Sequence, residues 1–453
     1  MTRTDLIIIG SGPGGYRAAE YAAKNGLQVV VAEKLHAGGT CLNCGCIPTK
    51  TFCHDAELID ELKDAEGLGL EGVSYRFNFA KAMERKQAVV ATLRAGVETL
   101  MALPGITFVR GEAKLTGTAV PAEGGGTLHT VEIGGAPYAA RNVIIATGSS
   151  PKMPPVKGIG SPAVLDSTGL LDIDRVPARL CIVGAGVIGM EFAGIFSSFG
   201  SEVTVVEFLK ECLPPVDSDI AKRMRKSMER KGVKFFFQSA VKEIDGGTVI
   251  FDRKGKEERV EADCILIATG RQPNTGGIGL EAAGVAFDRK GIRVDDHMQT
   301  SVPGIYAIGD VNGRLMLAHA ATAQGFRAVN HILGRADGIR LDVIPSAVFT
   351  NPEVGSVGLT EDQCKEGGIA HTVRKAYYRS NGKALAMNAT DGMLKLLAGD
   401  DGRIIGCHLY GAHAADIAQE AAALMSLGAT VAQLGEIVHT HPTLGELLQD
   451  AAL

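Results

Sequence analysis

One sequence pattern occurs twice in this chain, and this repetition constrains the fold more than any other feature. In the first copy, an apolar run at residues 5–10 leads into the glycine-rich loop GSGPGG at 10–15, and a helical pattern extends to about residue 25. A second apolar run at 27–32 then ends at Glu33. Strand, GxGxxG loop, helix, strand and acidic residue together predict a dinucleotide-binding unit. The glycines let the backbone approach a pyrophosphate, and the acidic side chain accepts hydrogen bonds from a ribose.

The same order of features returns in the middle of the chain. A strand at 180–183 leads into the loop GAGVIG at 184–189, and a further strand at 202–206 ends at Glu207. Two complete units predict two nucleotide cofactors, because a single cofactor would need this machinery only once. A carboxylate at position 207 would repel a 2′-phosphate and accept hydrogen bonds from a free ribose. The second unit is therefore predicted to prefer NAD over NADP.

A cysteine-rich run, GGTCLNCGCIPTK at residues 38–50, is the second informative feature. Cys41 and Cys46 are separated by four residues, and a turn between them would bring their Cα atoms within disulfide range, about 4.4–6.8 Å. Helix-forming residues follow Lys50, so both cysteines are expected at a helix N-terminus, where the thiolate is favoured. Other interpretations remain open: Cys41 and Cys44 fit a CxxC redox pair or half a zinc site, and free cysteines often pack as small apolar side chains.

These motifs resemble those of the flavin-dependent disulfide reductases, a class of pyridine nucleotide-disulfide oxidoreductases, and most closely those of the dihydrolipoamide dehydrogenases. The resemblance extends over essentially the full length of 453 residues. It implies an α/β fold with two Rossmann-like dinucleotide-binding domains and a C-terminal α+β dimerisation domain. The expected segments are an FAD-binding domain at 1–150, an NAD-binding domain at 151–270, a return segment completing the FAD domain at 271–341, and a dimer-interface domain at 342–453.

The resemblance also implies a role for each reacting side chain. Cys41 and Cys46 would form a redox-active disulfide, with Cys41 exchanging with substrate and Cys46 facing the flavin. The segment HTHPTLGE at 439–446 resembles the family's His–Glu dyad, with His441 as the base and Glu446 orienting it. Imidazole titrates near pH 6.5 and suits proton exchange with a thiol at neutral pH. In this family the dyad reaches the disulfide of the other subunit, which implies an obligate homodimer.

Further site residues are assigned by the same resemblance. Lys50 and Glu191 match a family ion pair beside the flavin; the alternative is an ordinary surface ion pair. The residues expected to bind FAD are Gly10, Gly12, Gly14, Gly15, Glu33, Lys34, Gly39, Thr40, Lys50, Ala113, Thr147, Gly148, Ser149, Asp310, Met316, Leu317, Ala318 and His319. Those expected to bind NAD are Gly184, Gly186, Val187, Ile188, Gly189, Glu191, Glu207, Val241 and Gly270.

Two positions depart from the family pattern. Cys44 stands where the family usually has an apolar residue, and it is expected to be a packed thiol rather than a third redox partner. Thr322 stands where dihydrolipoamide dehydrogenases usually have glutamate, which leaves the tuning of the flavin in doubt but not its presence. His439, His441 and Glu446 could also form half of a metal site, but no further cluster of ligands accompanies them, so no metal is predicted.

The activity implied by the resemblance is oxidation of dihydrolipoamide to lipoamide with reduction of NAD⁺ to NADH. Its implied partners are the lipoyl-bearing proteins of 2-oxoacid dehydrogenase or glycine cleavage complexes. Two alternatives remain: another NAD(P)H-linked disulfide or metal-ion reductase on the same scaffold, and a mainly structural flavoprotein subunit of an acyltransferase complex.

Composition limits the remaining possibilities. The formal net charge is −5 and lysine and arginine form no block, so neither nucleic acid nor an anionic membrane is an expected partner. No apolar run approaches the roughly 18–20 residues of a membrane span, and no signal peptide is expected. The nine cysteines follow no framework spacing, which indicates a reducing compartment and a cytoplasmic protein.

Overall fold

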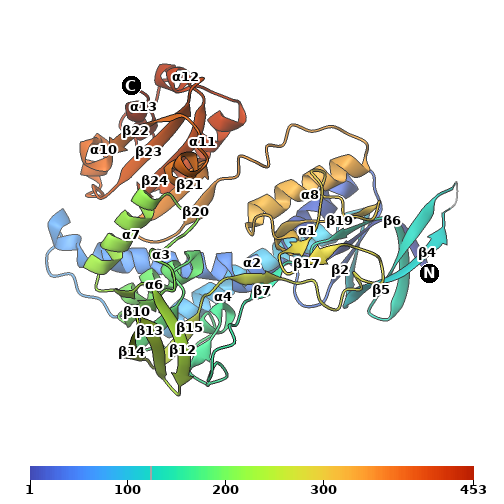
Figure 1. Cartoon of the computed structure of the whole chain (residues 1–453), viewed down its shortest axis with the longest axis horizontal. Coiled ribbons are helices and arrows are strands. Elements are labelled where there is room, and N and C mark those ends of the chain that lie inside the picture. Colours follow the sequence, from blue (N-terminus) through green and yellow to red (C-terminus); the bar gives the residue numbers. More distant parts are fainter. Residues whose placement is uncertain (123–124) are drawn as a thin grey trace. The chain divides into compact units, whose positions relative to one another are not determined.

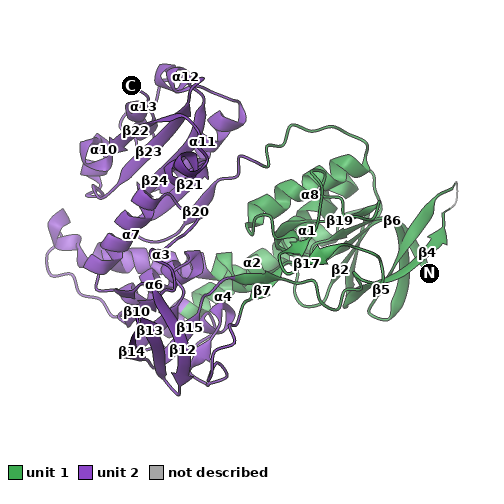
Figure 2. Ribbon diagram, in the orientation of Figure 1, with its two compact units in different colours: residues 1–48, 83–152, 271–341 green, residues 49–82, 153–270, 342–453 purple. Residues whose placement is uncertain are grey.

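The computed structural model describes residues 1–122 and 125–453, and these residues form two compact units (Figures 1 and 2). Unit 1 contains residues 1–48, 83–152 and 271–341. Unit 2 contains residues 49–82, 153–270 and 342–453. Each unit is therefore assembled from three separate stretches of the chain.

Unit 1 is built on a seven-stranded sheet with the order β3-β2-β1-β6-β5-β4, and β19 also pairs with β6. Strands β1, β2, β3, β6 and β19 are parallel, whereas β4 and β5 extend the sheet as an antiparallel pair. Residues 6–9 of β1 are almost completely buried, as expected for a strand of a parallel sheet that is covered on both faces. The strands are β1 (Thr2–Ile9), β2 (Val29–Glu33), β3 (Ile106–Arg110), β4 (Ala113–Pro121), β5 (Thr127–Ile133), β6 (Ala136–Ile145) and β19 (Ile305–Ala307).

Two helices of this unit pack closely because their contact is lined by small residues. A Cβ atom added at Gly325 of α8 would lie 3.1 Å from both the Ala18 Cβ and the Gly14 carbonyl oxygen of α1. Helix α1 therefore lies against α8 over the segment that follows the first glycine-rich loop. The helices that begin or lie in unit 1 are α1 (Pro13–Lys24), α2 (Gly39–Cys44), α3 (Cys46–Lys63), α4 (Phe79–Met101), η2 (Gly309–Asn312) and α8 (Ala318–Ile332).

The second glycine-rich loop follows β9 of a parallel sheet in unit 2. This sheet has the strand order β11-β10-β9-β15-β8. An antiparallel meander, β12-β13-β14, adjoins it. The strands are β8 (Val164–Leu165), β9 (Arg179–Val183), β10 (Glu202–Val206), β11 (Lys234–Phe236), β12 (Ser239–Asp245), β13 (Thr248–Arg253), β14 (Lys256–Glu261) and β15 (Cys264–Ile267). The helices here are η1 (Ala65–Leu68), α5 (Ser167–Leu170), α6 (Val187–Phe199) and α7 (Ser218–Arg230).

The C-terminal segment of unit 2 is an antiparallel sheet with the order β20-β21-β24-β23-β22, packed against helices (Figure 1). Its strands are β20 (Ser346–Val348), β21 (Glu353–Gly358), β22 (His371–Tyr377), β23 (Met393–Gly399) and β24 (Ile404–Gly411). Its helices are α9 (Glu361–Glu366), η3 (Tyr378–Ser380), α10 (Gly382–Ala386), α11 (Ala414–Ser426), α12 (Val431–Glu436) and α13 (Glu446–Ala452). Unit 1 also contains two short strand pairs. These are β7 (Ser149–Pro151) with β16 (Arg271–Pro273) and β17 (Phe287–Asp288) with β18 (Gly291–Ile292).

A buried lysine joins this C-terminal segment to α7. The Lys395 side chain is 1% exposed, and its Nζ lies 2.9 Å from both carboxylate oxygens of Asp217, which caps the N-terminus of α7. Asp219 and Glu361 approach the same ammonium at 3.2 and 2.5 Å. Hydrogen bonds from Lys365 and Lys395 lower the pKa of Glu361 from its ordinary value of 4.5 to about 2.

One local expectation is corrected. Cys46 is the first residue of α3, as expected, but Cys41 is the third residue of the separate short helix α2. The chain turns between the two helices at Gly45, where an added Cβ would lie 2.9 Å from the Thr40 carbonyl oxygen. The sequence did not predict two separate helices, because Gly45 marks the break alone, with neither a proline nor a second glycine next to it. Among the described residues, no helix is both long and apolar enough to cross a membrane.

Candidate active site

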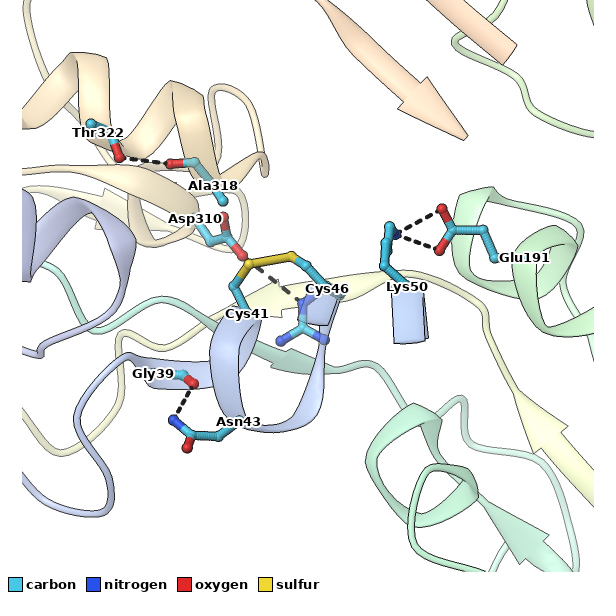
Figure 3. The surroundings of a disulfide bond; sticks show 10 residues. Gly39, Cys41, Asn43, Cys46, Lys50, Glu191, Asp310, Ala318 and Thr322 are labelled. Carbon is cyan, nitrogen blue, oxygen red and sulfur yellow. Dashed lines mark hydrogen bonds and ion pairs between the residues drawn. A yellow bond between two sulfur atoms is a disulfide. The ribbon is translucent and has the colours of Figure 1, made fainter. Parts of the chain in front are cut away.

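Cys41 and Cys46 form a disulfide with their Cα atoms 4.7 Å apart (Figure 3). The two cysteines that the sequence singled out are therefore paired, and the CxxC pairing of Cys41 with Cys44 is not the one formed. Cys53, Cys181, Cys212, Cys264, Cys364 and Cys407 form no disulfide. Burial is the largest cause that raises the thiol pKa of each of these six, to about 11 for Cys264 and about 12 for Cys181. They are therefore poor nucleophiles at neutral pH.

Helix α2, which carries Cys41, is fixed at its start by Asn43. The Asn43 amide donates hydrogen bonds to the carbonyl oxygens of Ala37 and Gly39 at 3.0 and 2.8 Å (Figure 3). Its own oxygen accepts from Arg94 Nε of α4 at 2.7 Å. The loop before the disulfide is thus tied to a long helix of the same unit.

The first glycine-rich loop has the shape and polarity that a pyrophosphate requires. A Cβ at Gly10 would lie 2.4 Å from the Ala146 carbonyl oxygen, whereas no atom lies within 4 Å of a Cβ built at Gly12. One glycine is therefore needed for close packing, and the other leaves open space over the start of α1. That helix has no side-chain cap and no acidic residue in its first turn, so its N-terminus is suited to an anion. These features fit the pyrophosphate of a dinucleotide.

The second loop repeats this geometry residue by residue. A Cβ at Gly184 would lie 2.5 Å from the Ala268 carbonyl oxygen, while the space at Gly186 is open. The N-terminus of α6 is also uncapped by side chains. The duplication read from the sequence thus extends to the local geometry, and this loop fits the pyrophosphate of a second dinucleotide equally well.

The acidic residues at the ends of β2 and β10 are held in the same way. Glu33 accepts from the Ser11 N–H at 2.9 Å and from the Leu35 N–H at 2.9 Å. Glu207 accepts from the Ala185 N–H at 2.5 Å and from the Leu209 N–H at 2.7 Å. Each carboxylate is fixed at the mouth of its loop, where the dinucleotide-binding arrangement requires a ribose acceptor.

A second cluster of predicted FAD residues lies around Asp310 in η2. The Ser149 hydroxyl donates to Asp310 at 2.5 Å, and Arg271 donates to the Ser149 hydroxyl and carbonyl oxygens at 2.7 and 2.6 Å. The Thr147 hydroxyl donates to the carbonyl oxygen of Asn274 at 2.8 Å. The ends of β6 and β19 therefore bring together residues from both halves of the interrupted first domain.

Sequence reasoning missed Arg271 and Asn274, which belong to this cluster. Both lie in the run RQPN at 271–274, which follows Ala268-Thr269-Gly270, a second copy of the ATG motif at 146–148. The pairing of β16 with β7 brings them to the first ATG motif. The repeated ATG could have drawn attention to this run, but the meeting of the two segments follows from the pairing of β16 with β7.

Lys50 and Glu191 form a partly buried ion pair rather than an ordinary surface pair. The Lys50 Nζ lies 2.9 and 2.8 Å from the two carboxylate oxygens of Glu191, whose side chain is 4% exposed (Figure 3). The Phe349 N–H donates to the same carboxylate at 2.9 Å. Phe349 was not anticipated from the sequence, because no pattern near position 349 indicates a contact with α3 or α6.

The His–Glu dyad is present in the C-terminal segment. His441 Nδ1 lies 2.8 Å from Glu446, whose other oxygen accepts from the Thr443 N–H at 2.8 Å. The hydrogen bond from Thr443, followed by that from His441, lowers the pKa of Glu446. The His441 side chain is 78% exposed, and its role as a base stays a prediction. The dyad belongs to unit 2 and the disulfide to unit 1.

The neighbouring histidine has a different environment. His439 is only 6% exposed, and its Nε2 lies 2.9 Å from Glu420 of α11, a partner that the sequence did not suggest. In the described part of the chain, no three His, Cys, Asp or Glu side chains are grouped to hold a metal ion.

The remaining predicted residues are distributed around these features. Ala113 begins β4, and Lys34 follows β2 directly. Val241 lies in β12, whose first residue, Ser239, donates its N–H to the Glu207 carbonyl oxygen at 2.9 Å. Leu317 is the N-cap of α8, so positions 316–319 span the start of that helix. Gly39 and Thr40 begin α2, Gly148 precedes β7, Gly270 precedes β16, and Val187 and Ile188 begin α6. The roles assigned to these residues stay predictions.

Thr322, at the position where the family usually has glutamate, contacts the backbone of two helices. Its hydroxyl donates to the Ala318 carbonyl oxygen at 3.2 Å and to the Pro13 carbonyl oxygen at 3.4 Å (Figure 3). A hydroxyl at this position therefore links α8 to the first turn of α1, where the usual glutamate would bring a negative charge.

The chain matches two family models, and together they cover most of its length. Residues 4–325 match "Pyridine nucleotide-disulphide oxidoreductase" and residues 344–452 match its dimerisation domain. A dihydrolipoyl dehydrogenase of Staphylococcus aureus is 39% identical over 99% of this chain and 96% of the relative. A dihydrolipoyl dehydrogenase of Geobacillus stearothermophilus is 37% identical over 99% and 95%.

Solved structures agree with these sequence matches. LpdA from Mycobacterium tuberculosis superposes with a TM-score of 0.90 at 29% identity, covering 100% of this chain and 99% of that one. The HOCl-induced flavoprotein disulfide reductase RclA from Escherichia coli superposes with a TM-score of 0.84 at 31% identity, covering 99% of both chains.

The predicted fold class, family and enzyme class are confirmed by these matches, and the FAD and NAD cofactors are confirmed as those of the family. The match to the dimerisation domain supports the predicted homodimer. A paired disulfide, two equivalent dinucleotide loops and full-length similarity to dihydrolipoyl dehydrogenases lead to one conclusion: this chain belongs to the pyridine nucleotide-disulphide oxidoreductase family.

Proposed function

We propose that this protein oxidises the dihydrolipoyl group to its cyclic disulfide and passes the electron pair to NAD⁺. The observation that carries the proposal is the Cys41–Cys46 disulfide. It stands in a chain that resembles dihydrolipoyl dehydrogenases over nearly its full length. A dithiol substrate can reduce a protein disulfide by thiol–disulfide exchange, because an S–S bond forms in the substrate as the S–S bond of the protein breaks.

In the first step of the proposed reaction, His441 takes a proton from a substrate thiol through Nε2, because its Nδ1 is engaged by Glu446. The substrate thiolate attacks Sγ of Cys41, the bond to Cys46 breaks, and Cys46 leaves as a thiolate. The second substrate thiol then displaces Cys41 from the mixed disulfide. The substrate leaves as a cyclic disulfide, and both cysteines remain reduced.

The reduced cysteines would lose their electron pair to NAD⁺ through FAD, a cofactor that would supply the hydride chemistry that cysteines lack. Residues 1–150 and 271–341 are proposed to hold the FAD, with the loop at 10–15 on its pyrophosphate and Glu33 on its ribose. Residues 151–270 are proposed to hold the NAD in the same manner, through Gly186 and Glu207. The Lys50 ammonium, held by Glu191, is proposed to supply positive charge beside the flavin.

The proposal includes a homodimer in which His441 acts on the disulfide of the partner subunit, in keeping with the match to a dimerisation domain. It also includes the lipoyl-bearing proteins of 2-oxoacid dehydrogenase or glycine cleavage complexes as partners. A cytoplasmic location is part of the proposal, since the seven cysteines other than Cys41 and Cys46 form no disulfide, which suits a reducing compartment.

Steady-state turnover of dihydrolipoamide with NAD⁺ by the flavin-loaded protein tests this function. We expect turnover in the ordinary range for enzymes, about 1–10³ s⁻¹, and its loss in the Cys46→Ser variant. Cys364→Ser is a matched control, because Cys364 is buried in α9 and has no assigned role. Negligible turnover by the loaded wild-type protein would contradict the proposal.

A second candidate is reduction of another disulfide or of a metal ion on the same scaffold. It is favoured by the similarity to RclA, whose Cu(II) complex superposes on this chain with a TM-score of 0.85 at 30% identity. NADH-driven reduction of Cu(II) or of a disulfide dye, in a sample that fails to oxidise dihydrolipoamide, would favour this candidate.

A further inference from the structure

Phe349 makes two separate contacts with the Lys50–Glu191 pair. Its backbone N–H donates to Glu191 Oε1 at 2.9 Å, the same oxygen that lies 2.9 Å from the Lys50 Nζ. Its ring faces the ammonium, with the Lys50 Nζ 4.7 Å from the ring centroid. One residue thus contacts both the carboxylate and the ammonium of the pair.

From this geometry we propose that Phe349 is a positioning residue that fixes the Lys50 ammonium and keeps it ready for its role beside the flavin. The inference rests on the proposed function, because that function assigns the role of Lys50. It adds a residue from the C-terminal segment to the site. Phe349 follows β20 directly and lies inside the match to the dimerisation domain at 344–452.

The physical reason is that the ion pair alone leaves the lysine free to move. A lysine side chain has four rotatable bonds and a strongly hydrated head group, and the Lys50 side chain is still 31% exposed. A carboxylate restrains the ammonium from one direction only. The electron-rich face of an aromatic ring attracts a cation from a second direction and excludes water there. Together they confine Nζ to a single position.

The Glu191 side chain is buried, only 4% exposed, which strengthens its interaction with Lys50. Cys53 lies on α3 one turn beyond Lys50. Burial raises the pKa of its thiol, the Glu191 carboxylate raises it further, and Lys50 lowers it. Cys53 is therefore close enough to the pair for both charges to influence its thiol.

The first test uses the apoprotein and does not depend on catalysis. The rate at which a small amine-acylating reagent modifies Lys50 is followed by peptide mass spectrometry, with Lys383 of α10 as the internal reference. Phe349→Leu removes the ring and is expected to raise the Lys50 rate by about 2- to 30-fold, the range that cation–π attraction spans. Phe349→Tyr keeps a ring and is expected to leave the rate near that of the wild type. Equal rates in wild type and Phe349→Leu would overturn the proposal.

The second test asks whether the ring acts through Lys50. Reduction of bound flavin by NADH is followed by stopped flow in the four proteins of a double-mutant cycle built from Phe349→Leu and Lys50→Met. We expect Phe349→Leu to slow reduction in the Lys50 background, with Phe349→Tyr restoring it, and to have no added effect in the Lys50→Met background. Equal slowing in both backgrounds, or none in either, would contradict a role through Lys50.

This design keeps the two proposals separable. Flavin reduction by NADH needs no dihydrolipoyl substrate, so a protein that fails to oxidise dihydrolipoamide still reports on Phe349. Flavin content and dimer mass are measured for each variant, so that a loss of cofactor or of assembly is recognised as such.

Discussion

At the scale of single residues, the chemistry depends on a few side chains whose partners fix their reactive atoms. Glu446 engages Nδ1 of His441, which leaves Nε2 for the proton transfer proposed above. Because its pKa is lowered, chiefly by the Thr443 N–H, Glu446 stays ionised through the neutral range. A carboxylate in this position fixes the tautomer and stabilises the imidazolium when the proton arrives.

Replacing His441 with Gln is therefore expected to lower kcat/KM for dihydrolipoamide by about 10²- to 10⁴-fold, the usual contribution of general acid–base catalysis. Glu446→Gln keeps a hydrogen-bond acceptor but removes the charge, so a smaller loss is expected. His439→Gln is the matched control, since His439 is buried against Glu420 and should affect stability more than proton transfer. The rates are measured across pH 5–9; wild-type activity in the His441→Gln variant would refute the assignment.

The residue scale is also where sequence reasoning had its clearest success and its clearest failure. Cys41 and Cys46 could be paired because the run at 38–50 resembles the active-site motif of the family, and a turn between them brings the two within disulfide range. Phe349 and Arg271 could not be found in this way, because their contacts join segments that are distant in the chain. Such contacts follow from strand pairing and packing, which no local pattern encodes.

At the scale of elements, strand ends and helix starts carry the binding groups. The acids at the ends of β2 and β10 bond to equivalent loop N–H groups, so strand, loop and helix act as one repeated unit. Helix α7, by contrast, is held from outside by Lys395 through Asp217. Removing one member of a buried ion cluster leaves the others uncompensated, which is usually strongly destabilising.

Glu361 gives this cluster a measurable pH dependence. Its pKa falls from 4.5 to about 2 on folding, so its contribution to stability is full above pH 4.5 and is lost as the pH falls towards 2. We expect Glu361→Gln to lower the free energy of unfolding at neutral pH and to flatten its decline over this acid range. Chemical denaturation at a series of pH values measures both effects. Parallel pH curves for the two proteins would show that Glu361 does not contribute in this way. Glu366→Gln, at the end of the same helix, is the control.

At the scale of the whole molecule, the sequence predicted the class of fold because two complete dinucleotide units are hard to place in any other architecture. The segment boundaries at 150, 270 and 341 stay predictions. Unit 2 also combines residues 49–82 with residues 153–270 and with the C-terminal segment. This grouping depends on long-range packing. The break between α2 and α3 was missed for a smaller reason, since a single glycine can end a helix or continue it.

The central claim is that the disulfide passes electrons between a dithiol and the flavin, and anaerobic titration of the loaded protein with dihydrolipoamide tests it most directly. We predict that one equivalent of dithiol per subunit produces the long-wavelength absorption of a thiolate lying against a flavin, and that Cys46→Ser abolishes this response. A flavin spectrum that does not change on addition of the dithiol, in wild-type protein with full flavin content, would contradict the account.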